Sequence, residues 1–452
     1  ERMRVAGQAL LDRYANLRTA FVDSASGDPV QLVLDGVELP WEFVDLSSRA
    51  EGEREEAFEE FLKRDHGRHF DPQRPPMLRL TLVALTEDRF ELVLTVHHTL
   101  FDGWSLPILF QELMRLYGAH GDGSVLPRVR SYRDFLAWLA RQDRAETARA
   151  WAAELDGVEE PTLLAPDTMG EAVGEATGIG SVEVELPDET ARALTRRAAE
   201  LGVTVNTLVQ GAWAVLLGQL TGRDDVVFGT TVSGRPPELA DVDSMVGLFI
   251  NTLPVRVRCA AGDTLADVLQ GTQEHQAALL DHHYYPLADI QQATGLNSLF
   301  DSLVVFESYP IDHDGLDDAN TAAGVRLTGL RHFSATHYPI TVLAEADPHL
   351  RFTLQFQEHV FEQGAVEEMA ARFGRVLAQL AADPQTRVAS VDVLEPGERD
   401  RVLRVLNDTA REVPEQTIHE LFEEWARRTP DAPAVVSGEQ SLTYAETNAR
   451  AN

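Results

Sequence analysis

Two adjacent histidines open the run of residues best suited to chemistry, HHTLFDG at 97–103. Imidazole is the side chain whose unperturbed pKa lies near neutrality, so it can take up and return a proton under physiological conditions. Successive side chains of a strand point to opposite faces, so His97 and His98 cannot both face one cavity. No cysteine or carboxylate stands nearby at a zinc-binding spacing. The pattern therefore predicts one positioned imidazole and no metal site.

Asp102 and Gly103 complete this run. The Asp102 carboxylate can orient the imidazole, or it can pair with a cation and hold the loop. Gly103 allows a turn where a side chain would intrude, and its backbone N–H can face a developing oxyanion. A bare histidine pair is more often structural than catalytic. The whole run, continued by Trp104 and Ser105 at the end of a strand, is far more specific.

Alternating strands and helices position these residues. A strand at 90–96 runs directly into the histidines, and helices are expected at 106–117 and 132–155. A stretch rich in Gly, Pro, Glu and Thr at 156–178 is the candidate linker. Beyond it we expect strands at 181–186, 226–231, 253–258, 302–306 and 350–356, and helices at 188–201, 205–220, 265–281 and 362–381. Both halves alternate strands with helices, which predicts two α/β lobes.

Composition excludes several classes of function. The 452 residues carry 73 acidic and 39 basic side chains, a net charge of -34, which repels nucleic acids and anionic membranes. No apolar run has the length needed to cross a bilayer. Cys259 is the only cysteine, so no internal disulfide can form, and a reducing cytoplasm is the expected location.

The 97–103 run resembles the active-site motif of condensation domains of nonribosomal peptide synthetases. Chloramphenicol-acetyltransferase-like acyltransferases share this motif. Further stretches resemble condensation-domain signatures, in the expected order: 17–21 (LRTAF), 132–138 (YRDFLAW) and 246–256 (VGLFINTLPVR). The stretch at 282–287 (HHYYPL) departs somewhat from its counterpart, and 297–300 (NSLF) keeps only the end of the last motif. The tail, at 421–425 and 442–446, resembles the opening of an adenylation domain.

The resemblance implies the fold and the division of the chain. We expect two chloramphenicol-acetyltransferase-like lobes in a V-shaped pseudo-dimer, with the active site at their junction. The N-terminal lobe is expected at 1–165, without the family's first segment, and the C-terminal lobe at 166–390. A linker at 391–415 and an adenylation-domain fragment at 416–452 would follow.

The resemblance also implies the reaction, in which an acceptor aminoacyl amine attacks a donor acyl or peptidyl thioester. Both substrates would hang on phosphopantetheine arms of donor and acceptor carrier domains, and the chain itself would bind no cofactor. The catalytic residues are expected to be His98 and Gly103, supported by His97 and by Asp102. Arg235, in the stretch SGRP, is the expected cation beside Asp102, and Trp104 and Asn251 are expected to line the substrate site.

Three alternatives stay open. An epimerisation domain of the same fold is disfavoured by DGWS at 102–105 and NTLP at 251–254. A catalytically silent module that recruits carriers or other proteins is disfavoured by the intact His98. A free-standing acyltransferase that uses coenzyme A is disfavoured by the adenylation-like tail. The peptide product, the acceptor residue and the donor stereochemistry are not specified by the sequence.

Overall fold

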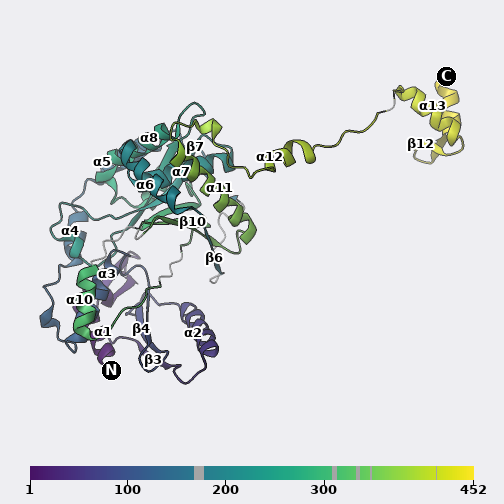
Figure 1. Ribbon diagram of the computed structural model, residues 1–452. Coiled ribbons are helices and arrows are strands. Elements are labelled where there is room, and N and C mark those ends of the chain that lie inside the picture. Colours follow the sequence, from purple (N-terminus) through teal and green to yellow (C-terminus); the bar gives the residue numbers. More distant parts are fainter. Residues whose placement is uncertain (167–177, 308–312, 332–335, 347–348, 414) are drawn as a thin grey trace. The chain divides into compact units, whose positions relative to one another are not determined.

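A computed structural model describes residues 1–166, 178–307, 313–331, 336–346, 349–413 and 415–452 (Figure 1). They divide into two compact units, Glu1–Val393 and Leu394–Asn452. Much of the candidate linker at 156–178 lies outside the described residues. The expected boundaries at 165, 390 and 415 stay predictions.

A six-stranded mixed sheet organises the second half of the larger unit. Its strands are β6 (Ile179–Glu183), β7 (Asp225–Val232), β8 (Asn251–Arg258), β9 (Ser302–Glu307), β10 (Ile340–Glu345) and β11 (Arg351–Gln357). Their order across the sheet is β6-β11-β10-β9-β7-β8. Strand β9 runs parallel to its neighbours β7 and β10, and the other pairs are antiparallel.

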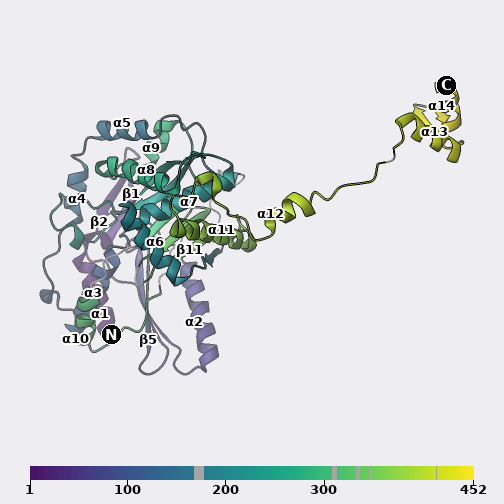
Figure 2. The ribbon, with the colours of Figure 1, turned by 45° about the horizontal axis from the view of Figure 1, so that its top comes forward.

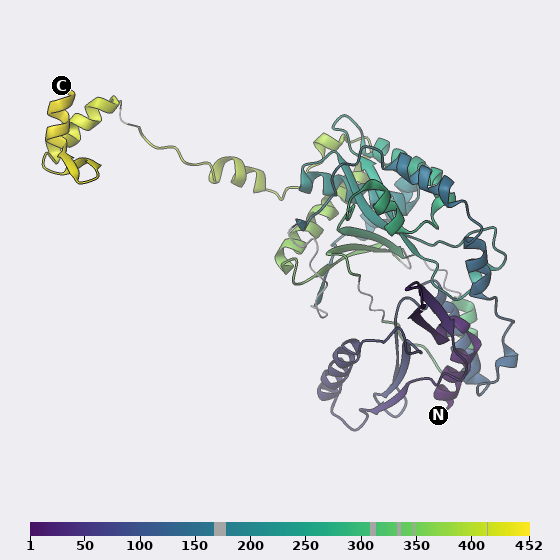
Figure 3. The ribbon, with the colours of Figure 1, turned by 180° about the vertical axis from the view of Figure 1, so that it is seen from behind.

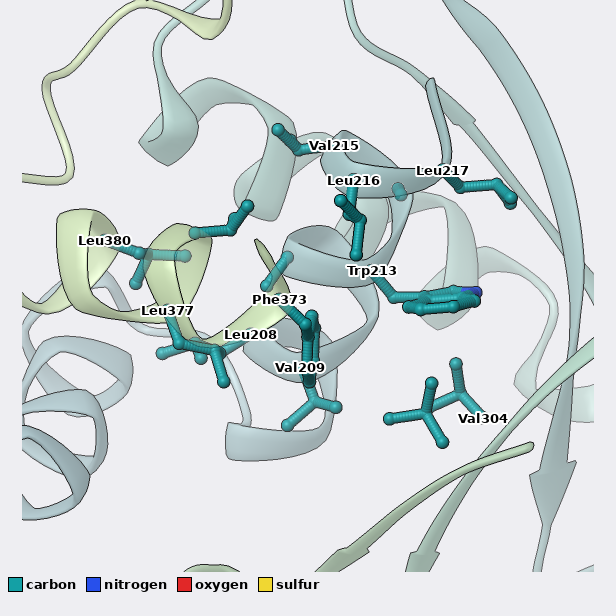
Figure 4. Packing of buried hydrophobic residues seen from close by; sticks show 14 of the residues in the cluster. Leu208, Val209, Trp213, Val215, Leu216, Leu217, Val304, Phe373, Leu377 and Leu380 are labelled. Carbon is teal, nitrogen blue, oxygen red and sulfur yellow. The ribbon is translucent and has the colours of Figure 1, made fainter. Parts of the chain in front are cut away.

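Four helices bury one face of this sheet in the largest hydrophobic core. They are α6 (Asp188–Leu201), α7 (Val205–Thr221), α8 (Leu265–Ala278) and α11 (Gln363–Ala382). Helix α7 is apolar on nearly every side, which is typical of a helix buried all round. Its Trp213 packs edge-on against Phe373 of α11, with ring centroids 5.9 Å apart, and lies near Val304 of the sheet (Figure 4).

A three-stranded sheet, in the order β3-β4-β5, organises the first half. Its strands are β3 (Trp41–Asp45), β4 (Leu78–Ala84) and β5 (Phe90–Val96), where β5 has the bounds expected from the sequence. Helix α2 (Glu51–His66) packs Phe58 and Phe61 against Val83, and it lies beside this sheet in Figure 3. A hairpin of β1 (Thr19–Asp23) and β2 (Pro29–Val33) completes this part.

Helices from distant parts of the chain share the second core of this half. Helices α1 (Arg2–Arg13) and α3 (Ser105–Gly118) pack together, with Leu11 and Leu116 almost fully buried. Helix α10 (His313–Ala323), which follows β9 of the other sheet, packs against α3 (Figures 1 and 2). The chain thus returns to the first half after forming most of the second.

The prediction of a single helix at 132–155 is wrong, because the chain forms two helices there. Helix α4 (Tyr132–Leu139) ends at Ala140, and α5 (Arg144–Glu154) begins after Asp143. The Asp143 carboxylate accepts hydrogen bonds from the backbone N–H groups of Ala145 and Glu146. Aspartate favours this capping position over a helix interior, which explains the break.

The smaller unit has its own short elements: α12 (Glu398–Asp400), a π-helical turn at Arg401–Val405, α13 (Ile418–Arg428), β12 (Pro433–Ser437), β13 (Gln440–Thr443) and α14 (Tyr444–Ala451). Capping boxes begin α13, through Thr417 and Glu420, and α14, through Thr443 and Glu446.

Within the described ranges, no single helix is long and apolar enough to span a membrane, whereas α6 and α7, bent by 105° between them, pass that test together by length and composition.

Candidate active site

Residues 97–104, here called the histidine loop, connect β5 to α3. Buried residues anchor this loop to the core of the first half. The backbone N–H of His97 donates to the carbonyl of Met77 at 2.9 Å, and that of Leu100 donates to the carbonyl of His97 at 3.1 Å, which closes a turn. Leu100 and Phe101 are 2% and 5% exposed in the core of the first half. Their burial directs the turn at 97–99 away from the core.

The two histidines have different surroundings. His97 is half-buried, and its Nδ1 accepts a hydrogen bond from the Thr99 backbone N–H at 3.3 Å and lies 2.8 Å from the Thr99 hydroxyl. Burial, together with the neighbouring His98, lowers the pKa of His97. The His98 side chain is exposed, and no protein group in the described part of the chain binds its ring. Its nitrogens are therefore open to a ligand.

Asp102 is fully engaged with groups other than the histidines. Its Oδ1 accepts hydrogen bonds from the Ser105 hydroxyl at 2.8 Å and the Ser105 N–H at 3.1 Å, and Arg235 approaches it at 3.2 Å. Its Oδ2 accepts from the backbone N–H groups of Phe249 and Ile250, at 3.0 and 3.3 Å. The side chain is 0% exposed. This arrangement holds the loop and joins it to the 246–251 segment.

Arg235 lies beside Asp102, as the family resemblance implied. Its Nη1 donates to the carbonyls of Val242 at 2.5 Å and Met245 at 3.0 Å, and its guanidinium carbon lies 4.0 Å from the ring centroid of Phe249. Burial lowers the pKa of this arginine, and the Asp102 charge opposes that effect. Arginine ionises so far above neutrality that it stays charged, so the pair is a buried ion pair.

Glycine is required immediately before Arg235. Gly234 has a φ of +60°, a conformation that side chains rarely adopt. A Cβ atom there would collide with the backbone carbonyl of Phe249. The chain therefore passes close to the 246–251 segment only because this position has no side chain.

The 246–251 segment, which precedes β8, binds the histidine loop directly. The Gly247 carbonyl accepts from the Asp102 N–H at 3.1 Å and lies 3.1 Å from the Ser105 hydroxyl oxygen, and the Gly247 N–H donates to that oxygen at 3.1 Å. Val246 is buried in the core of the first half. Tyr132 of α4 donates its hydroxyl proton to the carbonyl of Leu248 at 2.5 Å. Both halves of the larger unit thus meet at Asp102.

The remaining expected site residues surround this junction. Gly103 lies in the turn before α3, and its carbonyl accepts from the Leu106 N–H at 3.2 Å. The ring centroid of half-buried Trp104 lies 5.5 Å from the Arg235 guanidinium carbon. The Asn251 side chain donates to the carbonyls of His283 and Tyr285. Their expected substrate contacts stay predictions.

Several residues of this junction were given no individual role in the site from the sequence. Ser105, Phe249 and Tyr132 supply contacts that hold the loop, and Thr147 of α5 binds His282 and Tyr284. Ser105 had a visible signal, because a hydroxyl three residues after an aspartate suits the first turn of a helix.

A cavity of about 210 Å³ lies outside the histidine loop, beside Gly157 and Arg223.

Comparisons with known proteins show the family of the chain. A family model described as the condensation domain matches residues 1–403. The chain is 35% identical over 457 residues to a component of the linear gramicidin synthase of Brevibacillus parabrevis, covering 99% of this chain and 9% of that protein. It is 34% identical over 458 residues to a component of the mycosubtilin synthase of Bacillus subtilis, covering 98% and 17%. The chain thus spans less than a fifth of the length of these relatives.

Solved structures share the fold. The X-domain from teicoplanin biosynthesis superposes with a TM-score of 0.72 at 24% identity, covering 87% of this chain and 90% of that one. The first condensation domain of the calcium-dependent antibiotic synthetase, in complex with a substrate analogue, gives 0.69 at 23%, with the same coverage. The four-domain nonribosomal peptide synthetase AB3403 gives 0.71 at 18%, covering 98% of this chain and 34% of that one. At these identities the likeness shows the fold alone.

Proposed function

Because the chain belongs to the condensation-domain family of nonribosomal peptide synthetases, we propose that it forms a peptide bond between two thioester-bound substrates. The observation that carries this proposal is the exposed imidazole of His98, near the start of a loop whose Asp102 binds elements of both halves. An open imidazole on a loop that is held at this junction suits proton transfer between two substrates that meet there.

The reaction requires no cofactor, because the bond that forms and the bond that breaks account for all atoms and electrons. The amine nitrogen of the acceptor attacks the thioester carbonyl carbon of the donor, so that a C–N bond forms and the C–S bond breaks. His98 takes the proton released by the attacking amine and returns it to the departing sulfur. A thioester is already an activated acyl group. Proximity of the two reactants can lower the activation barrier by roughly 7–11 kcal/mol, and a base in the right place can raise the rate about 10²–10⁴-fold.

The other site residues support this step. The Gly103 N–H faces the oxyanion that develops on the donor carbonyl. His97 packs behind His98, and the Asp102–Arg235 pair keeps the loop in place. Trp104 and Asn251 belong to the walls of the substrate site.

The partners follow from the substrates. Donor and acceptor carrier domains bring the two thioesters on phosphopantetheine arms, an adenylation domain adjoins the C-terminal end, and the assembly acts in the cytoplasm. Two tethered chains that meet at His98 need separate entrances, so we propose a passage open on two sides between V-shaped lobes. Neither nucleic acid nor a membrane is a partner in this scheme.

The test is the reconstituted reaction. The chain is mixed with a donor carrier loaded with an aminoacyl thioester and an acceptor carrier loaded with another, and mass spectrometry follows both arms. We expect a dipeptidyl thioester on the acceptor and a free thiol on the donor. Loaded carriers that stay unchanged would contradict the proposal, and inversion of the donor residue would indicate an epimerisation domain.

A silent recruitment module is the second candidate. The X-domain from teicoplanin biosynthesis shares the fold, and one of its solved structures is a complex with OxyB. This candidate predicts binding of a carrier or another protein with no change in either thioester. The intact and exposed His98 favours catalysis over this role.

A further inference from the structure

Asn251, the first residue of β8, binds a segment far away in the chain. Its Nδ2 donates to the carbonyl of His283 at 2.9 Å and to the carbonyl of Tyr285 at 2.7 Å. A carboxamide nitrogen carries two protons, so both donors of this side chain are engaged with backbone. The most direct effect of Asn251 is therefore on the position of residues 283–285.

The residues just before Asn251 bind the histidine loop. The backbone N–H groups of Phe249 and Ile250 donate to Oδ2 of Asp102, four residues after His98. Three consecutive residues thus bind the loop on one side and the 283–285 backbone on the other. No flexible connection separates the two sets of bonds.

The 282–285 segment is also fixed from its far side. The hydroxyl of Thr147, on α5, lies 2.9 Å from Nδ1 of His282 and 2.5 Å from the hydroxyl of Tyr284. Trp151 donates its indole N–H to the carbonyl of His282 at 3.2 Å. Since α5 fixes one side of this segment, the Asn251 carboxamide determines where its other side lies relative to the histidine loop.

We propose that Asn251 is a positioning residue, whose carboxamide sets the distance between the 283–285 backbone and the His98 loop and thereby places the substrates for reaction. The inference rests on the proposed function. A reacting group displaced by about 1 Å can lose roughly 10²-fold in rate, so an error in this distance affects the chemical step.

Two substitutions separate positioning from general damage. Asn251→Ala removes both donors, and it should lower the single-turnover rate about 10–100-fold while the KM for loaded carriers stays unchanged. Asn251→Asp keeps the shape but turns a carboxylate toward two carbonyl oxygens. Protonation returns one donor, so the rate of this variant relative to wild type should rise as the pH is lowered, whereas the relative rate of Asn251→Ala should stay flat.

Gln379 of α11 offers a matched control. Its Nε2 donates to two backbone carbonyls, those of Arg375 at 3.0 Å and Asp392 at 2.8 Å, outside the site. Gln379→Ala therefore removes the same kind of bonds, together with a third that Oε1 accepts from the Asp392 N–H at 3.0 Å. We expect a similar fall in melting temperature and a wild-type rate.

Hydrogen exchange tests the inference without activity. Asn251→Ala should speed exchange at the backbone N–H groups of Asp102, Ile250 and Tyr285, which donate to Gly247, Asp102 and His282 respectively, and Gln379→Ala should not. If wild type forms no peptide, the proposed function fails and the exchange result still decides the inference. Any of three results would overturn the inference: a wild-type rate in Asn251→Ala, a relative rate of Asn251→Asp that does not change with pH, or unchanged hydrogen exchange in Asn251→Ala.

Discussion

Arg235 and Asp102, 133 residues apart in the chain, form an ion pair whose side chains are 3% and 0% exposed. The pair joins the turn after β7 to the loop after β5. Asp102 also accepts hydrogen bonds from the 246–251 segment, so one carboxylate holds three segments together. The carboxylate therefore holds the loop whose backbone carries the exposed His98.

Asp102→Ala should therefore destabilise the larger unit and abolish activity. Removing one member of a buried ion pair leaves the other charge uncompensated and costs about 3–5 kcal/mol. Chemical denaturation beside rate measurements checks this. Asp289→Ala, which removes a more exposed partner of Arg144, should cost no more than about 1 kcal/mol. An inactive Asp102→Ala protein of unchanged stability would show instead that Asp102 takes part in the chemistry.

His98→Ala should lose most of the peptide-forming activity and keep its fold, because the exposed ring makes no bond to the described protein. A rate loss of about 10²–10⁴-fold is expected for a missing general base. His97→Ala should retain more activity, since Thr99 is the one hydrogen-bond partner of the His97 ring among the residues that the structure describes. Equal, wild-type rates for both variants would refute the assignment of the base.

Gly234→Ala should destabilise the protein by clearly more than an alanine at another positive-φ glycine. Gly27 is the matched control: its φ is +85° and its added Cβ would meet nothing within 4 Å. Gly27→Ala should cost about 1–2 kcal/mol from backbone strain alone. Gly234→Ala adds the collision with the Phe249 carbonyl and should also lower activity. Equal losses of stability would show that the 246–251 segment can move aside.

Acid should weaken the larger unit through His283. Burial lowers the pKa of this imidazole to about 4, below the ordinary value of 6.5. Between these values the unfolded chain binds the proton and the folded chain does not, so this contribution to stability is complete above pH 6.5 and falls as the pH drops toward 4. From about pH 7.5 to 5.5 the loss is on the order of 1 kcal/mol.

Urea unfolding of His283→Asn at several pH values checks this contribution. The variant should lose less stability on acidification than wild type does, whereas the exposed control His120→Asn should follow wild type. Parallel curves for His283→Asn and wild type would refute the assignment.

The elements around the site were largely predictable because their signals are local. The strand at 90–96 and the helix after it were expected almost as observed, since apolar periodicity and the turn residues lie within the elements themselves. Strand β10 was not expected. Its run ITVLAE mixes residues that favour strands with others that favour helices, and only its neighbours β9 and β11 decide between them.

The order of residues along the chain was enough to show that two histidines follow a strand, that Asp102 comes four residues after His98, and that a family resemblance pairs Asp102 with Arg235. The packed structure was needed to show that the Asp102 carboxylate binds Phe249 and Ile250 rather than an imidazole. It also decided that Asn251 uses its donors on the 283–285 backbone. Periodicity and capping act between residues a few positions apart, whereas these bonds join positions 32 to 148 residues apart. Such bonds depend on how the sheets and helices pack.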